Sequence, residues 1–263
     1  MIPMIVKLFS DPSVFRKGFL YVWNLLMNEF RQYSMIVSIL SSALFVVAAA
    51  IIFTVRQNRR DKLGVVPKKN YFREVGFTKA PLSVCAVSVV FGAALNRIVT
   101  YIVNFIPWSD FFVNSFKRTY GRLSDDGTPL YIVILCTVVM APIAEEFLFR
   151  GIACSRLSPA FPRAAVVVFS SLVFGIVHGT PIAMIYASAF GVVQASVFLR
   201  HRSLYPVMLS HLAFNLTAIV FDEACGVPTL DLFIFFTCAA VSVAGIWFVT
   251  RKKKEVFPEA YEI

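Results

Sequence analysis

Two adjacent glutamates lie in a stretch of the chain that is otherwise almost entirely apolar. Glu145 and Glu146 fall within residues 130–150, and they are the only acidic side chains inside the long apolar segments that follow residue 34. A carboxylate in hydrocarbon costs several kcal/mol or loses its charge, so such residues usually face a bundle interior and have a function. Two neighbouring carboxylates also need a cation, hydrogen bonds or a shared proton, and each of these changes their chemistry. The pair therefore marks a candidate site.

A few further polar residues lie in apolar segments and form a set with the glutamates. Glu146 and Arg150 are four residues apart, so they share a face of a helix and can pair. Glu145 lies about 100° around the helix from Glu146, so the guanidinium can hold one carboxylate ionised while the other faces elsewhere. His211 and Asn215 are also four residues apart and project together.

The spacing predicts that these groups lie at a similar depth. Glu145 lies 16 residues before the turn centred near Phe161, and His178 lies 17 residues after it. At a rise of about 1.5 Å per residue, the two side chains reach similar levels. His211 lies nine residues past Arg202 on the same side. We therefore expect four side chains to converge in one cavity below the cytoplasmic surface: Glu145, His178, His211 and Asn215.

Such a cavity suits the hydrolysis of a peptide bond. A carboxylate and a histidine on facing helices can hold a water, with the carboxylate as general base for attack on a carbonyl. A second histidine and an asparagine amide can donate hydrogen bonds to the developing oxyanion. Alternatively, Glu145, His178 and His211 could bind a divalent metal such as zinc. We favour the route without a metal or other cofactor.

Composition and hydropathy predict an all-α, polytopic transmembrane bundle. Hydrophobic residues make up 58% of the 263 residues and charged residues 15%, against roughly 45–50% and about 25% in soluble domains. Apolar segments of about 20 residues can cross a ~30 Å hydrocarbon core. We expect seven or eight spans, because residues 14–30 either cross or lie at the interface as an amphipathic helix. The other seven are 35–55, 80–106, 130–157, 165–180, 182–199, 204–221 and 232–249. This predicts an N-terminal interfacial or short membrane segment at 1–34, a bundle at 35–250 and a cytoplasmic tail at 251–263.

The net charge of +10 is distributed by loop and forms no nucleic-acid patch. Basic clusters follow alternate spans, as the positive-inside rule requires. The opposite loops, at 107–129 and 222–231, are neutral or acidic. We therefore expect an integral membrane protein with a cytoplasmic C-terminus, the lipid bilayer as a partner and no nucleic acid.

Three motifs resemble those of the CPBP family, which comprises the CAAX proteases and the bacteriocin-processing (Abi) membrane proteins and includes the Ras-converting CAAX endopeptidases. The motifs occur in the family's order within residues 125–220. They are Glu145-Glu146-x-x-x-Arg150, Phe174-x-x-x-His178 and His211-x-x-x-Asn215.

The resemblance implies an intramembrane endopeptidase of a bacterial plasma membrane, acting on a peptide or protein with or without a lipid modification. It implies that Glu145 and His178 activate water and that His211 and Asn215 support the oxyanion. It also implies that the second glutamate and the arginine of the first motif, Glu146 and Arg150, order the site.

The motifs of other protease classes are absent from the sequence. It has no His-Glu-x-x-His helix, no aspartate in a span and no Gly-x-Ser-x-Gly elbow, which argues against a zinc-helix, aspartyl or serine protease. A non-catalytic membrane protein stays open as the alternative. In an immunity factor, a scaffold or a transporter, the buried charges would brace or gate the bundle.

Overall fold

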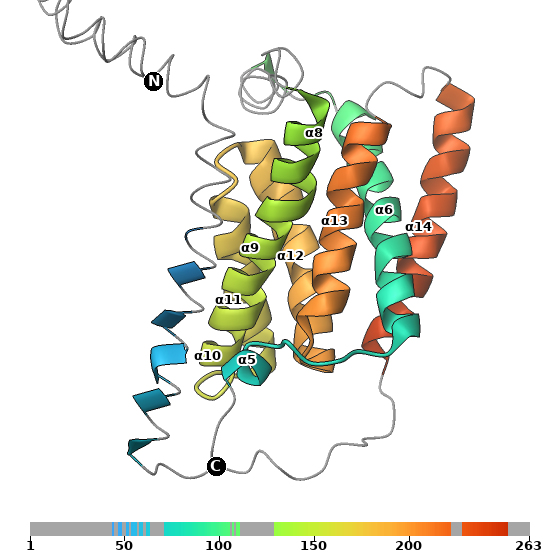
Figure 1. Cartoon of the computed structure of the whole chain (residues 1–263). Coiled ribbons are helices and arrows are strands. Elements are labelled where there is room, and N and C mark those ends of the chain that lie inside the picture. The colour runs from blue at the N-terminus through green and yellow to red at the C-terminus, as the bar shows by residue number, and fades with distance from the viewer. Residues whose placement is uncertain are drawn as a thin grey trace, which may run out of the picture.

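A computed structural model of the chain describes residues 71–105, 107, 109, 110, 129–221 and 228–251, and scattered positions between 44 and 63. Within these residues the regular elements are helices and there is no strand. The long helices stand side by side in a single bundle (Figure 1). The predicted all-α class is confirmed.

Several helices are long and apolar enough to cross a bilayer. Within the described residues there are four such segments, and the helices α11 (Arg163–Ile176) and α13 (Leu204–Val220) are apolar but shorter. The four are α6 (Leu82–Phe105), Leu130–Leu157, α12 (Pro181–His201) and Leu232–Thr250 within α14 (Pro228–Thr250). The predicted count of seven or eight spans is therefore not confirmed. The predicted spans at 14–30 and, for the most part, 35–55 lie outside the described residues.

The span Leu130–Leu157 is one continuous helix in which the backbone hydrogen bonds alternate between the α-helical and the π-helical pattern. Its α-helical parts are α8 (Leu130–Val133), α9 (Ala141–Glu146) and α10 (Ser155–Leu157), and its π-helical parts are η1 (Ile134–Met140) and η2 (Phe147–Cys154). Pro142 lies just after η1 and cannot donate a backbone hydrogen bond. Wider turns of this kind are frequent at functional sites.

Close helix contacts at small residues fix the positions of the elements that carry the polar set. A Cβ added to Gly92 of α6 would lie 2.3 Å from the backbone oxygen of Ser210 in α13. A Cβ added to Gly175 of α11 would lie 2.6 Å from the backbone oxygen of Met184 in α12. Backbones approach this closely only where no side chain intervenes. α13 is thereby held on α6, and α11 on α12.

A short segment after α5 (Tyr71–Glu74) ties the turn between α12 and α13 to the rest of the bundle. The backbone N–H of Leu204 donates to the carbonyl of Gly76 at 2.8 Å. The hydroxyl of Thr78 donates to the carbonyl of Arg202, and the hydroxyl of Ser203 donates to the carbonyl of Thr78, both at 2.6 Å. These bonds fix the point at which α13 begins, and hence the height of its polar residues.

Candidate active site

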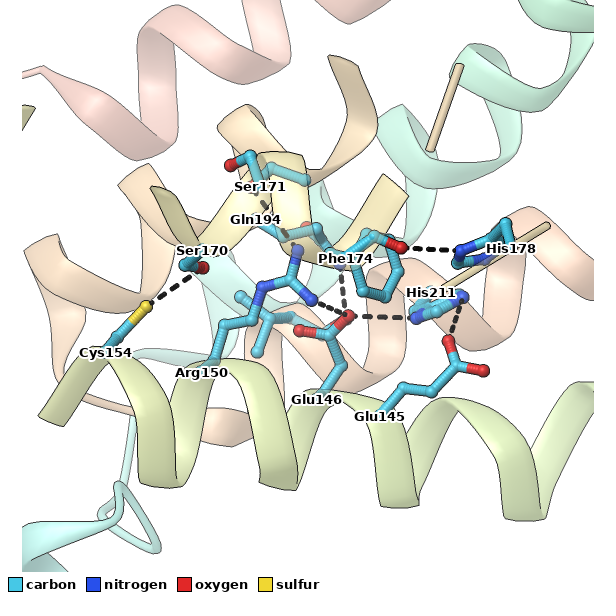
Figure 2. A network of polar contacts seen from close by, with 12 residues as sticks. Glu145, Glu146, Arg150, Cys154, Ser170, Ser171, Phe174, His178, Gln194 and His211 are labelled. Carbon is cyan, nitrogen blue, oxygen red and sulfur yellow. Dashed lines mark hydrogen bonds and ion pairs between the residues drawn. The ribbon is translucent and has the colours of Figure 1, made fainter. Parts of the chain in front are cut away.

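The second glutamate of the first motif is paired deep inside the bundle. Glu146 and Arg150 are both fully buried, and a guanidinium nitrogen of Arg150 lies 3.2 Å from Oε1 of Glu146. The same guanidinium donates to the carbonyl of Gly191 in α12 at 3.4 Å and stacks over the ring of Phe174 in α11 at 4.2 Å. The arginine therefore joins three helices, and the ion pair that the spacing predicts is formed (Figure 2).

His211 lies between the two neighbouring carboxylates. Its Nδ1 is 2.9 Å from Oε1 of Glu146, and its Nε2 is 3.8 Å from Oε2 of Glu145. The carboxylate of Glu146 accepts the bond from Nδ1, which fixes the orientation of the ring. The ring also meets those of Phe174 and Phe190 edge-on, at 5.9 Å and 5.2 Å between centroids. His211 thus lies among two carboxylates and two aromatic rings.

His178 lies in the turn between α11 and α12, beyond the last helical residue of α11. The backbone carbonyl of Phe174 lies 2.7 Å from Nδ1 and accepts its hydrogen. In a neutral imidazole this leaves Nε2 as the unprotonated nitrogen. The ring of Phe174 packs against the histidine edge-on at 4.8 Å, so this phenylalanine walls one side of it as the spacing predicts.

Asn215 lies one turn beyond His211 on α13. Its amide contacts the continuous helix Leu130–Leu157, which carries the first motif and is called the first-motif helix below. Its Nδ2 donates to the backbone carbonyl of Thr137 in η1 at 2.7 Å. This contact joins the last motif to the helix that carries the first motif, through a main-chain oxygen. No motif or spacing in the sequence connects Thr137 with the site.

These side chains share one cavity of about 290 Å³. Its polar lining includes Glu145, His178, His211 and Asn215, which come from the three motifs. The remaining lining is mostly apolar: Ala141, Phe174, Val177, Tyr186, Ala187, Phe190 and Phe214, with Thr137 beside them. The side chain of Glu145 is 33% exposed, whereas Glu146 and Arg150 are fully buried and absent from the lining. The structure therefore separates the six predicted site residues into four on the cavity and two behind it.

The three side chains considered from sequence as metal ligands, Glu145, His178 and His211, all line this cavity. Among the residues that the structure describes, no group of three or more histidine, cysteine, aspartate or glutamate side chains could hold a metal ion. Nδ1 of His178 is bonded to a main-chain carbonyl and Nδ1 of His211 to Glu146. These bonds leave Nε2 of each ring as the nitrogen that a metal would use, so the choice between the metal-free route and the metal route stays a prediction.

Comparison with protein families returned one match. Residues 127–217 match the family described as type II CAAX prenyl endopeptidase Rce1-like. The match confirms the family predicted from the motifs, and this Rce1-like segment contains all three of them. No curated protein and no solved structure matched the chain. Together with the apolar helices, the family indicates an integral membrane protein.

Proposed function

We propose that the protein is an intramembrane endopeptidase that hydrolyses a peptide bond with water activated by Glu145 and His178. The observation that carries this proposal is the cavity in which Glu145, His178, His211 and Asn215 meet. The family match supports it, because the family is one of endopeptidases. We place the reaction near the cytoplasmic side, where the alternation of loop charge puts the basic turns.

The attacking water is held between the first two motifs. Glu145 is the partly exposed carboxylate, so it can take a proton from the water as its oxygen attacks the carbonyl carbon. The unprotonated Nε2 of His178 accepts the second hydrogen and orients the water. When the carbon–nitrogen bond breaks, Glu145 returns the proton to the leaving amine.

The oxyanion is held by the last motif. Asn215 uses one amide hydrogen on Thr137 and has a second for the substrate oxygen. A donor role for Nε2 of His211 requires the imidazolium, whose charge the Glu146 carboxylate offsets. Hydrogen bonds aimed at the developing charge are usually the largest single contribution to such catalysis.

The apolar side of the cavity indicates what part of the substrate binds there. Phe190, Phe214 and Val177 line it, and Tyr186 stacks on Phe214 at 6.3 Å between ring centroids. An apolar group of the substrate would lose its contact with water here and gain packing with these rings. We therefore propose a peptide or protein substrate that places an apolar residue or lipid beside the cleaved bond.

Cleavage of a peptide library by the purified protein tests the proposal. We expect Glu145→Gln to lower turnover by about 10²–10⁴ because the near-isosteric amide cannot accept a proton. The folded yield and the melting temperature should stay close to those of the wild type, since Glu145 lies on the cavity rather than in the buried pair.

Glu74→Gln, which makes the same change in α5, is the matched control and should cleave like the wild type. A folded wild-type protein that cleaves no peptide in the library, or a Glu145→Gln variant of full activity, would contradict the proposal. The first result would favour a non-catalytic scaffold, immunity factor or transporter.

A further inference from the structure

The hydrogen-bond register of the first-motif helix leaves one carbonyl without its helical donor. The backbone N–H of Ala141 bonds to the carbonyl of Cys136, five residues before it. The next pair in this register would join the N–H of residue 142 to the carbonyl of Thr137. Residue 142 is proline, which has no N–H. In an α-helix the N–H of Ala141 would donate to the carbonyl of Thr137, four residues before it. Here that N–H donates to Cys136 instead, so the carbonyl of Thr137 receives no hydrogen bond from it.

Asn215 supplies the missing donor from the facing helix. Its Nδ2 lies 2.7 Å from the carbonyl oxygen of Thr137, the shortest distance that this bond class normally shows. An amide nitrogen carries two hydrogens in one plane. Once one hydrogen is fixed on Thr137, the direction of the other is fixed as well. Thr137 and Asn215 both line the cavity beside Glu145 and His211.

We propose that Pro142 is a positioning residue for catalysis: it holds η1 in the register that presents the Thr137 carbonyl to Asn215, and so aims the second amide hydrogen at the oxyanion. This inference rests on the proposed function. Pro142 acts only through Asn215, because it is fully buried in the helix and does not line the cavity. The alternative is that the bond merely ties two helices together, in which case it would affect stability and not catalysis.

Two substitutions restore the N–H at residue 142 while changing its volume in opposite directions. Pro142→Ala is slightly smaller than proline and Pro142→Val slightly larger, and both allow α-helical pairing of Thr137 with Ala141. The carbonyl then points along the helix axis and Asn215 loses its acceptor. We expect both variants to lower kcat about tenfold, part of the loss of about 10²–10³ expected for removing an oxyanion donor. KM for the peptide cleaved by the wild type and the melting temperature should hardly change.

The same substitutions in an Asn215→Ala background separate positioning from general damage. Asn215→Ala alone should be slow but measurable, and adding Pro142→Ala to it should cost less than about twofold. Pro162→Ala, at the exposed N-cap of α11, is the matched proline control and should retain full activity.

An equal loss of kcat in both backgrounds, or unchanged kcat in Pro142→Ala and Pro142→Val, would overturn the inference. The proposed function is tested separately by Glu145→Gln. If that variant is inactive and both Pro142 variants are fully active, the protease proposal stands and the positioning role falls. If Glu145→Gln is fully active, the protease proposal itself falls.

Discussion

Glu145 and Glu146 have different surroundings although they are neighbours in the chain. Glu146 is fully buried, with Arg150 and His211 both bonded to its Oε1. Glu145 is a third exposed and faces the cavity. An ion pair inside a bundle fixes geometry, whereas a carboxylate beside water can exchange protons. We therefore propose that Glu146 orders the site and that Glu145 does the chemistry.

The buried pair leads to a prediction about stability. Arg150→Ala leaves the Glu146 carboxylate buried without its cation, which typically costs roughly 3–5 kcal/mol. It also removes the contacts with Gly191 and Phe174 that join α11 and α12 to the first motif. We expect a lower yield of monodisperse protein and a lower melting temperature, measured by gel filtration and thermal unfolding in detergent.

Arg156→Ala is the matched control, because Arg156 lies on the same continuous helix, Leu130–Leu157, but is exposed. Arg150→Lys should recover only part of the stability, since an ammonium lacks the planar fork that reaches several acceptors. Equal melting temperatures for Arg150→Ala and Arg156→Ala would show that the pair does not hold the site together.

At the scale of the element, helical spacing predicts much of the site. The i,i+4 spacing of Glu146 and Arg150 predicts their pairing, and that of Phe174 and His178 predicts the aromatic wall. Counting residues on each side of the turn predicts that the motifs reach one cavity, and they do. These features follow from a regular rise and twist, which the sequence pattern reports directly.

The irregular features could not be predicted in the same way. Hydropathy does not report whether a backbone N–H pairs four or five residues back, so η1 and η2 were not expected. Pro142 is a local signal of such a departure, because proline has no backbone N–H to donate. The bond between His211 and Glu146 depends on the rotation of α13 against the first-motif helix, which tertiary packing decides. α11 ends at Ile176, four residues before the end of the predicted span 165–180, because the chain turns at Val177 and His178.

The contact between α6 and α13 leads to a prediction about packing. Gly92→Ala would place a Cβ 2.3 Å from the backbone oxygen of Ser210, so the two helices must separate. Overpacking of this kind costs typically 1–3 kcal/mol. Because Ser210 precedes His211, we expect lower activity as well as a lower melting temperature. Val90→Ala, at a 54% exposed position of the same helix, should change both far less. A Gly92→Ala variant as stable and active as Val90→Ala would show that the contact can relax.

At the scale of the whole molecule, large apolar side chains lie on the outer surface of the bundle as well as in its core. Large apolar side chains of α14 point outward, with Phe233 69% and Trp247 62% exposed, while the charged pair of Glu146 and Arg150 lies at the centre. Lipid covers such an outer face without cost, and the interior must satisfy its own polar groups. The cavity therefore depends on the assembled bundle, because its polar residues come from segments that only the complete packing brings together. The cytoplasmic position of the C-terminus stays a prediction from loop charge.

The same dependence on assembly leads to a prediction about metal. Zinc ligands drawn from the three motifs would join three helices, so removing a bound zinc would destabilise the whole bundle as well as abolish activity. We propose instead that the side chains alone hold the water, because no group of three or more histidine, cysteine, aspartate or glutamate side chains that could hold a metal ion is found among the described residues. Treatment with a chelator should therefore leave the melting temperature and the peptide-cleavage rate unchanged, and elemental analysis of active protein should find zinc well below one equivalent. Stoichiometric zinc whose removal abolishes cleavage, and whose return restores it, would refute the metal-free mechanism while leaving the protease assignment intact.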